Sequence, residues 1–256
     1  MNLFKGFSNE EKSRIRYIVS DVDDTITCDG LLHPDALNAL YMIRERGLKT
    51  VLVTGGSAGW ADGYIRQWPV DAVVAESGAL LIYRKDGHIV YETNPSIDCD
   101  DYNYKRDELL RLTKDFVFSS DQYARLYDIA YEKMALDGKK EKKLFDAIRT
   151  LGGFALVSSI HVNVLFAPLN KRKGIDDFFP RLKDVLDIEM SIYEFYSHTL
   201  ALGDSLNDEA LFEAFPISVG NKRVYDEYGR FEHPPGYVTT LYGGDSFAKV
   251  IADLLV

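Results

Sequence analysis

The chain has 256 residues, 46% of them hydrophobic, and a formal net charge of −10 at pH 7. This composition predicts a globular protein of one or two domains, and the negative charge argues against partners such as nucleic acid or an anionic membrane surface. No apolar run approaches the roughly 18 residues that a membrane-spanning helix needs, and the N-terminal segment lacks the apolar region of a signal peptide. Two cysteines form no disulfide framework and no zinc motif, so we expect a soluble, cytoplasmic protein.

Strand and helix patterns alternate over the first eighty residues. The predicted elements are a strand at 17–20, a helix at 34–46, a strand at 50–53, a helix at 58–67 and a strand at 72–75. Two strand–helix–strand units in succession imply a parallel, doubly wound sheet, in which ligands bind at the carboxyl ends of the strands. The same pattern returns near the C-terminus. Its predicted elements are a helix at 174–185 that Pro180 breaks or bends, a strand at 199–202 and a helix at 246–255.

The middle of the chain has the pattern of an antiparallel sheet with helices. Its predicted elements are a hairpin over 80–92, a helix at 105–116, a strand within 124–132, a helix within 139–153 and strands at 154–159 and 161–168. We therefore predict an α/β protein whose Rossmann-like core domain comprises residues 1–81 and 167–256. Residues 82–166 are predicted to form a separate α+β domain, inserted like a lid.

Carboxylates are crowded at the end of the first predicted strand, at Asp21, Asp23 and Asp24. Such groups repel one another, and the repulsion is usually retained only where a cation or a chemical task compensates it. A turn that begins a solvated loop is the alternative interpretation.

A second polar cluster follows the strand at 199–202, where Asp204, Asn207 and Asp208 enter a turn before a helix. Parallel strands deliver both clusters to the same edge of the sheet. Hard oxygen ligands in this number suit Mg²⁺, so we predict a magnesium site there.

Two further stretches carry groups that bind anions. Thr54 provides a hydroxyl at a strand end, and the glycines Gly55 and Gly56 after it allow backbone N–H groups to approach a phosphate closely. Lys173 precedes Gly174 at a predicted helix start and is a candidate point charge for a phosphate, although a surface lysine is the alternative.

In chain order, DVDDT at 21–25, Thr54, Lys173 and GDSLND at 203–208 resemble the four motifs of the haloacid dehalogenase superfamily of phosphotransferases. The insert between the second and third motifs is similar to the C2 cap of the subclass that includes Cof-type sugar phosphatases and the sucrose-, trehalose- and mannosylglycerate-phosphate phosphatases. Two positions depart from the family pattern. Asp24 stands where the family usually has Gly, and Gly56 where many Cof-type members have Arg.

The resemblance implies a role for each motif residue. Asp21 would be the nucleophile that forms an aspartyl-phosphate, and Asp23 would protonate the leaving alcohol and then activate water. Mg²⁺ would be held by Asp21, the backbone carbonyl of Asp23 and Asp204, with Asp208 orienting these ligands. The expected phosphate-binding residues are Thr54, Gly55, Lys173 and Asn207.

The predicted activity is Mg²⁺-dependent hydrolysis of a phosphomonoester, with a sugar phosphate or a related small phosphorylated metabolite as substrate. A phosphomutase of the phosphomannomutase type is one alternative, because its second motif also contains Gly-Gly-Ser. A non-catalytic phospho-switch or binding module is another. His161 and Asn163 share one face of a predicted strand and are candidates for contact with the leaving group, with ordinary solvent exposure as the alternative. Trp60 and Trp68 are interpreted as core or interdomain contacts. Neither the leaving group nor the oligomeric state is indicated by the sequence.

Overall fold

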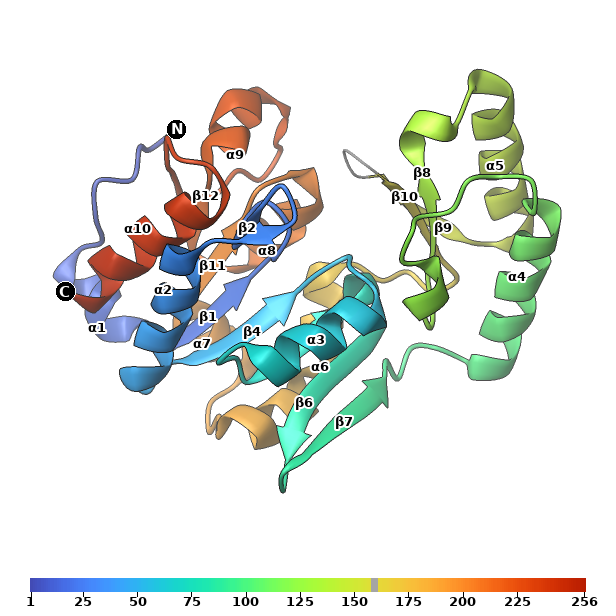
Figure 1. The fold of residues 1–256 in the computed structure, drawn as a ribbon. Coiled ribbons are helices and arrows are strands. Elements are labelled where there is room, and N and C mark those ends of the chain that lie inside the picture. Colours follow the sequence, from blue (N-terminus) through green and yellow to red (C-terminus); the bar gives the residue numbers. More distant parts are fainter. Residues whose placement is uncertain (158–160) are drawn as a thin grey trace.

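The computed structural model describes residues 1–157 and 161–256, and Figure 1 shows two parts that lie side by side. The strands are β1 (Tyr17–Ser20), β2 (Thr27–Cys28), β3 (Leu31–Leu32), β4 (Lys49–Val53), β5 (Ala72–Ala75), β6 (Leu80–Lys85), β7 (His88–Thr93), β8 (Ile129–Glu132), β9 (Phe154–Val157), β10 (His161–Leu165), β11 (Thr199–Gly203), β12 (Ile217–Gly220) and β13 (Tyr237–Val238). The α-helices are α1 (Asn9–Arg14), α2 (Pro34–Glu45), α3 (Ala58–Gln67), α4 (Cys99–Leu112), α5 (Gly138–Leu151), α6 (Lys171–Leu186), α7 (Ile192–Ser197), α8 (Glu209–Ala214), α9 (Lys222–Glu227) and α10 (Gly243–Leu255). Short 3₁₀ helices are η1 (Glu76–Gly78), η2 (Gln122–Ala124), η3 (Lys133–Ala135), η4 (Leu206–Asp208) and η5 (Tyr228–Arg230).

An eight-stranded sheet forms the larger part, with the strand order β13-β12-β11-β1-β4-β5-β6-β7. The strands from β13 to β5 are parallel, and β1 lies between β11 and β4. This arrangement confirms the predicted α/β class. It also places the carboxyl ends of β1 and β11 beside each other, which brings the two predicted acidic clusters together.

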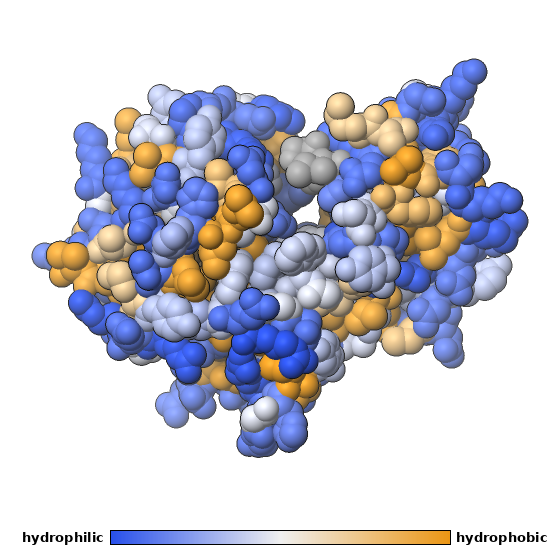
Figure 2. Space-filling model, in the orientation of Figure 1, coloured by the Kyte–Doolittle hydropathy of each residue, from blue (hydrophilic) through white to orange (hydrophobic). Residues whose placement is uncertain are grey.

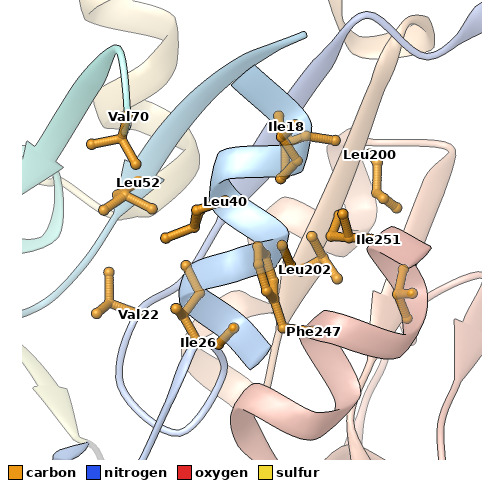
Figure 3. Packing of buried hydrophobic residues seen from close by; sticks show 14 of the residues in the cluster. Ile18, Val22, Ile26, Leu40, Leu52, Val70, Leu200, Leu202, Phe247 and Ile251 are labelled. Atoms are coloured by element: carbon orange, nitrogen blue, oxygen red, sulfur yellow. The ribbon is translucent and has the colours of Figure 1, made fainter. Parts of the chain in front are cut away.

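Helices cover both faces of this sheet, because alternate strand residues point to opposite sides. On one face, β1 and β4 contribute Ile18 and Leu52 to a core that contains α2, α3 and α10, and Figure 3 shows part of this packing. On the other face, Val19 and Val51 pack against α6, α7 and α8. Burial on both sides explains why the parallel strands are continuous apolar runs in the sequence.

The predicted boundary of the insert at residue 82 is wrong. The hairpin at 80–92 forms as expected, but β6 pairs antiparallel with β5 and β7 pairs with β6, so both strands extend the core sheet. Periodicity identifies a hairpin but does not reveal which sheet it joins. We place the inserted domain at residues 94–170 and call it the cap.

The cap has a three-stranded antiparallel sheet of order β8-β10-β9 and two helices, α4 and α5. In Figure 1 this sheet lies between the two helices and the core. Helix α4 begins before the predicted residue 105 because the Asp98 side chain caps it by accepting a hydrogen bond from the Asp100 N–H. The last two residues of the strand predicted at 154–159 lie outside the described residues.

Helix α6 begins three residues before the predicted start and continues through Pro180 without a break. Asn170 is its N-cap, and the Asn170 side chain accepts a hydrogen bond from the Lys173 N–H. The first turn of α6 lies against η1, where a methyl group at Gly174 would be 2.5 Å from the Cα of Gly78. This close approach requires glycine and holds the start of α6 at the edge of the sheet. Within the described residues, every helix is too short or too polar to cross a lipid bilayer.

Candidate active site

A cavity of about 890 Å³ lies between the carboxyl edge of the core sheet and the cap. Figure 2 shows the molecular surface hollowed between the two parts. The core contributes Asp21, Asp23 and Asp204 to its lining, and the cap contributes Asp121 and Arg125. The cavity therefore opens onto the predicted acidic residues and has a roof provided by the insert.

Three carboxylates converge at the base of this cavity, and we call Asp21, Asp204 and Asp208 the acidic cluster. Each offers an oxygen atom, and these atoms lie within 4.8 Å of one another. Their residues are only 5%, 4% and 0% exposed, respectively. Asp21 directly follows β1, where its N–H donates to Leu202 O of β11, so strand pairing fixes the position of this carboxylate.

The lysine that reaches this cluster is Lys171, whereas the sequence prediction chose Lys173. Lys171 Nζ lies 2.7 Å from an Asp21 oxygen and 2.5 Å from an Asp208 oxygen, and the residue is buried. Lys173 pairs instead with Asp177, one turn along α6, and its side chain is 41% exposed. Residues two apart on a helix differ by about 200° in direction, so the two lysines cannot share a face.

Burial dominates the electrostatics of the cluster. Desolvation raises the pKa of Asp21 well above its usual value, and the neighbouring carboxylates raise it further, against the effect of Lys171. The same causes raise the pKa of Asp204 to about 7. Desolvation lowers the pKa of Lys171, but Asp208 and Asp21 outweigh it, and the net shift is upward. Lys171 pairs with Asp21 and Asp208, and Asp204 shares the guanidinium of Arg223 with Asp24, so the cluster has an excess of negative charge.

This donor set fits a hard divalent cation. The acidic cluster provides only oxygen ligands, and its uncompensated charge favours a bound cation such as Mg²⁺. Asp208 is already engaged, because one of its oxygens receives Lys171 and the other accepts from the N–H groups of Asp204 and Ser205. Asp21 and Asp204 therefore have the freer oxygens.

Asp23 projects into the cavity above the cluster and is solvent-exposed. Partial desolvation between the cavity walls raises the pKa of Asp23, and the charge of Asp24 adds to the effect. Asp24 adopts a left-handed backbone conformation with φ of 56°, which explains why glycine suits this position. Its carboxylate pairs with Arg223 at 3.0 Å, and Arg223 also lies 3.1 Å from Asp204. The extra charge at Asp24 is therefore balanced by an arginine that sequence reasoning missed.

The loop between β4 and α3 places the predicted anion-binding groups. Thr54 is buried below this loop, and its Oγ1 accepts from the Gly56 N–H at 2.8 Å. Gly55 and Gly56 line the cavity. Ser57 is the N-cap of α3 and accepts from the Trp60 N–H. Capping gives this serine a structural role, so the Gly-Gly-Ser sequence does not by itself indicate a phosphomutase.

Asn207 also lines the cavity, on η4 next to Asp208. His161 and Asn163 of β10 reach the cavity from the cap, as their shared face predicted. Asn163 donates to Asp128 at 2.6 Å. Of the predicted site residues, Lys173 alone points elsewhere, and Thr54 supports the loop from beneath.

A buried polar joint that the sequence did not reveal connects the cap to the core. Glu76 of η1 is fully buried, and its carboxylate accepts four N–H groups, from Ala58 of α3 and from residues 126–128 of the cap. Desolvation and the nearby Asp128 raise the pKa of Glu76 to about 7. Arg125 pairs with Asp128 at 2.8 Å and donates to Gly55 O at 3.0 Å. The joint thus links the cap directly to the loop between β4 and α3.

Comparison with solved structures finds the same fold. A Thermoplasma acidophilum protein is 17% identical with a TM-score of 0.71, over 94% of this chain and 99% of that one. A haloalkanoate superfamily phosphatase from Bacteroides thetaiotaomicron is 18% identical with a TM-score of 0.65, over 99% and 100% of the two chains. The C-terminal domain of C. albicans trehalose-6-phosphate phosphatase is 12% identical with a TM-score of 0.61, over 100% and 99%.

Among curated proteins, none matches the sequence significantly. The family model of the haloacid dehalogenase-like hydrolases matches residues 18–196, which is more than half of the chain and spans the first three motifs. The family predicted from the motifs is confirmed, and the protein belongs to the haloacid dehalogenase-like hydrolases.

Proposed function

We propose that this hydrolase is a Mg²⁺-dependent phosphomonoesterase whose nucleophile is Asp21. The observation that carries the proposal is the pairing of Asp21 with Lys171 at 2.7 Å, at the base of a cavity that also contains Asp23 and Asp204. The ammonium favours the ionised form of the Asp21 carboxylate and fixes its position, and it offsets the repulsion between this carboxylate and a phosphate.

The reaction proceeds in two displacements. An oxygen of Asp21 attacks phosphorus while the ester oxygen leaves and takes a proton from Asp23, whose raised pKa suits an acid. Water then attacks phosphorus of the aspartyl-phosphate, Asp23 accepts the proton of that water, and phosphate leaves with Asp21 regenerated. The backbone N–H of Gly55 binds a phosphate oxygen, and Asn207 lines the same cavity.

Asp21 and Asp204, with the backbone carbonyl of Asp23, would hold Mg²⁺, and Asp208 would orient Lys171 and the turn at Asp204. A bound Mg²⁺ supplies positive charge between the phosphate and the carboxylates. The proposed substrate class is a small phosphorylated metabolite, and a sugar phosphate is favoured by the family resemblance and by the structure of the cavity wall described below.

The test is turnover of p-nitrophenyl phosphate and of a panel of phosphorylated metabolites with Mg²⁺. Asp21→Asn should abolish turnover, because it removes the nucleophile at constant volume. Retention of more than about a tenth of wild-type activity would exclude the aspartyl-phosphate route. A requirement for a sugar bisphosphate activator would identify a mutase instead.

A further inference from the structure

An aromatic row follows one face of α3 and forms a wall of the cavity. Its members are Trp60 and Tyr64, which are four residues apart on the helix, and Trp68, which is the C-cap residue directly after it. The rings of Trp60 and Tyr64 are 6.2 Å apart with planes inclined at 21°, and those of Tyr64 and Trp68 are 4.4 Å apart at 29°. The three rings thus form a stacked surface along the helix.

Trp60 is not a core residue, which was one of the two roles, core or interdomain contact, that the sequence suggested. It is 57% exposed, whereas Tyr64 is 8% exposed and packs in the core below the sheet edge. An exposed tryptophan that lines a cavity presents a large apolar face to whatever enters it.

Gly63 leaves this face open. It lies in the interior of α3 and lines the cavity, and a methyl group added to it would meet no atom within 4 Å. Glycine in a helix interior costs about 1 kcal/mol relative to alanine, so packing gives no reason for it here. A longer side chain at this position would lean towards the preceding turn and cover Trp60.

The aromatic row adjoins the reacting groups. Burial raises the pKa of the Tyr64 hydroxyl far above its usual value, and the charges of Asp23, Asp21 and Asp121 add to the rise. Tyr64 and Asp23, the carboxylate that is proposed to protonate the leaving group, line the same cavity. A leaving group bound at Asp23 would lie beside the row.

The lining of the cavity also includes polar side chains. Asp29 and Gln67 contribute from the core, and Ser119, Asp121 and Asn163 from the cap. Such groups accept hydrogen bonds from hydroxyls. A nucleobase is usually held between two apolar faces, whereas a pyranose has an apolar C–H face and an edge of hydroxyls. An aromatic wall in the same cavity as several acceptors matches the pyranose, and 890 Å³ lies in the range of small-molecule sites.

We propose that the aromatic row of α3 binds the pyranose ring of a phosphorylated sugar and determines which phosphate esters this enzyme prefers. The inference rests on the proposed function, which it deepens by assigning the leaving-group site to a core helix. Trp60 supplies the contact surface, and Gly63 keeps it accessible.

Kinetics with three kinds of substrate provides the first test. The probes are the pyranose esters glucose 6-phosphate, mannose 6-phosphate and trehalose 6-phosphate, the ringless glycerol 3-phosphate, and adenosine monophosphate. Trp60→Ala should lower the ratio of kcat/KM between the best pyranose ester and glycerol 3-phosphate by about tenfold or more, mainly through KM. Tyr41→Ala is the matched control, since Tyr41 is 47% exposed on α2 and does not line the cavity. It should leave the ratio unchanged.

Gly63 provides a second, independent test. Gly63→Leu should raise KM for the pyranose ester about tenfold, because the new side chain covers the row. Gly63→Ala should raise the melting temperature through helix propensity, which shows that the position tolerates a side chain. If Gly63→Leu folds and binds pyranose esters as well as wild type does, the proposal is wrong.

Binding without turnover separates this inference from the proposed function. The chain has two tryptophans, so Trp68→Phe leaves Trp60 as the fluorescent probe. In an Asp21→Asn, Trp68→Phe variant, saturable quenching by glucose 6-phosphate or trehalose 6-phosphate but not by glycerol 3-phosphate would support the row as a pyranose site. Tight quenching by adenosine monophosphate alone would overturn it in favour of a nucleobase.

The two failures are distinguishable. If the wild type hydrolyses no phosphomonoester, including p-nitrophenyl phosphate, the proposed function fails, whereas the fluorescence titration still decides what the row binds. If the wild type is active and Trp60→Ala leaves the substrate ratio unchanged, the proposed function stands and the row has no role in specificity.

Discussion

Lys171 and Asp21 form an ion pair of 2.7 Å in which both side chains are only 7% exposed. The pair depends on the first turn of α6, where Asn170, the N-cap residue of this helix, places Lys171 at the first helical position, towards the sheet edge. It predicts a sharp difference between the two lysines of this turn.

Lys171→Met should lower kcat for p-nitrophenyl phosphate by at least about a hundredfold, because Asp21 and Asp208 lose the buried ammonium with which both are paired. Lys173→Met should stay within about twofold of wild type, since its exposed pair with Asp177 contributes little. Circular dichroism of both variants controls for folding. Equal losses of kcat in the two variants would contradict a special role for Lys171, and a larger loss in Lys173→Met would assign the catalytic role to Lys173.

Mg²⁺ should stabilise the fold through the acidic cluster. We expect the melting temperature of the wild type to rise with Mg²⁺ concentration, because the ion binds the folded state and relieves the repulsion among the carboxylates. Asp204→Asn should remove most of this rise. EDTA should abolish turnover, and Ca²⁺ should inhibit, since its larger and looser shell misplaces the nucleophile. Full activity in chelator would refute the metal assignment.

Glu76 should make the stability of the protein depend on pH. Its pKa is raised from 4.5 to about 7 in the folded state, so protonation favours folding. The stabilisation by protonated Glu76 is fully present below pH 4.5 and is lost as the pH rises to about 7. It contributes at most about 3 kcal/mol to the free energy of unfolding. Glu76→Gln has no such titration. Urea unfolding between pH 5 and 8 should therefore show the stability of the wild type, relative to this variant, falling as pH rises, and a constant difference would contradict the assignment.

The buried pair of Arg125 and Asp128 should be strongly coupled. Arg125→Met should cost about 3 to 5 kcal/mol of unfolding free energy, because it leaves the fully buried Asp128 without its cation. In a double-mutant cycle, the variant that also carries Asp128→Asn should regain part of this unfolding free energy. The exposed pair of Arg149 and Asp146 is the control, and its loss should cost less than about 1 kcal/mol. Additive losses at the buried pair would show that the two residues act independently.

The sequence predicted those parts of the site that follow directly from a strand. Asp21 and Asp204 come immediately after apolar runs, and parallel pairing brings the ends of such strands together, so the acidic cluster was accessible to local reasoning. The position of Lys171 was not, because it depends on the residue at which a helix begins. Asn170 was the available signal, since an asparagine before the first turn places Lys171 at its first position.

The features that the sequence did not predict depend on contacts between distant parts of the chain. The hairpin β6–β7 was recognised, but its partner β5 was not, because both possible sheets would bury the same apolar face. Arg223 and Glu76 make their contacts with residues far away in the chain, and neither belongs to a motif. Only the packed structure shows that Arg223 balances Asp24 and that Glu76 receives the cap.

Helix α3 starts at Ala58, directly after the loop of Gly55 and Gly56 that is proposed to bind phosphate. With a rise of 1.5 Å per residue, Trp60 lies about 4.5 Å and Tyr64 about 10 Å along the helix axis from Ser57, the N-cap residue of α3. Ala61, Tyr64 and Ile65 pack the helix into the core cluster. The position of each aromatic residue along α3 therefore sets its distance from the bound phosphate. Movement of the cap would change access to the cavity but not this distance.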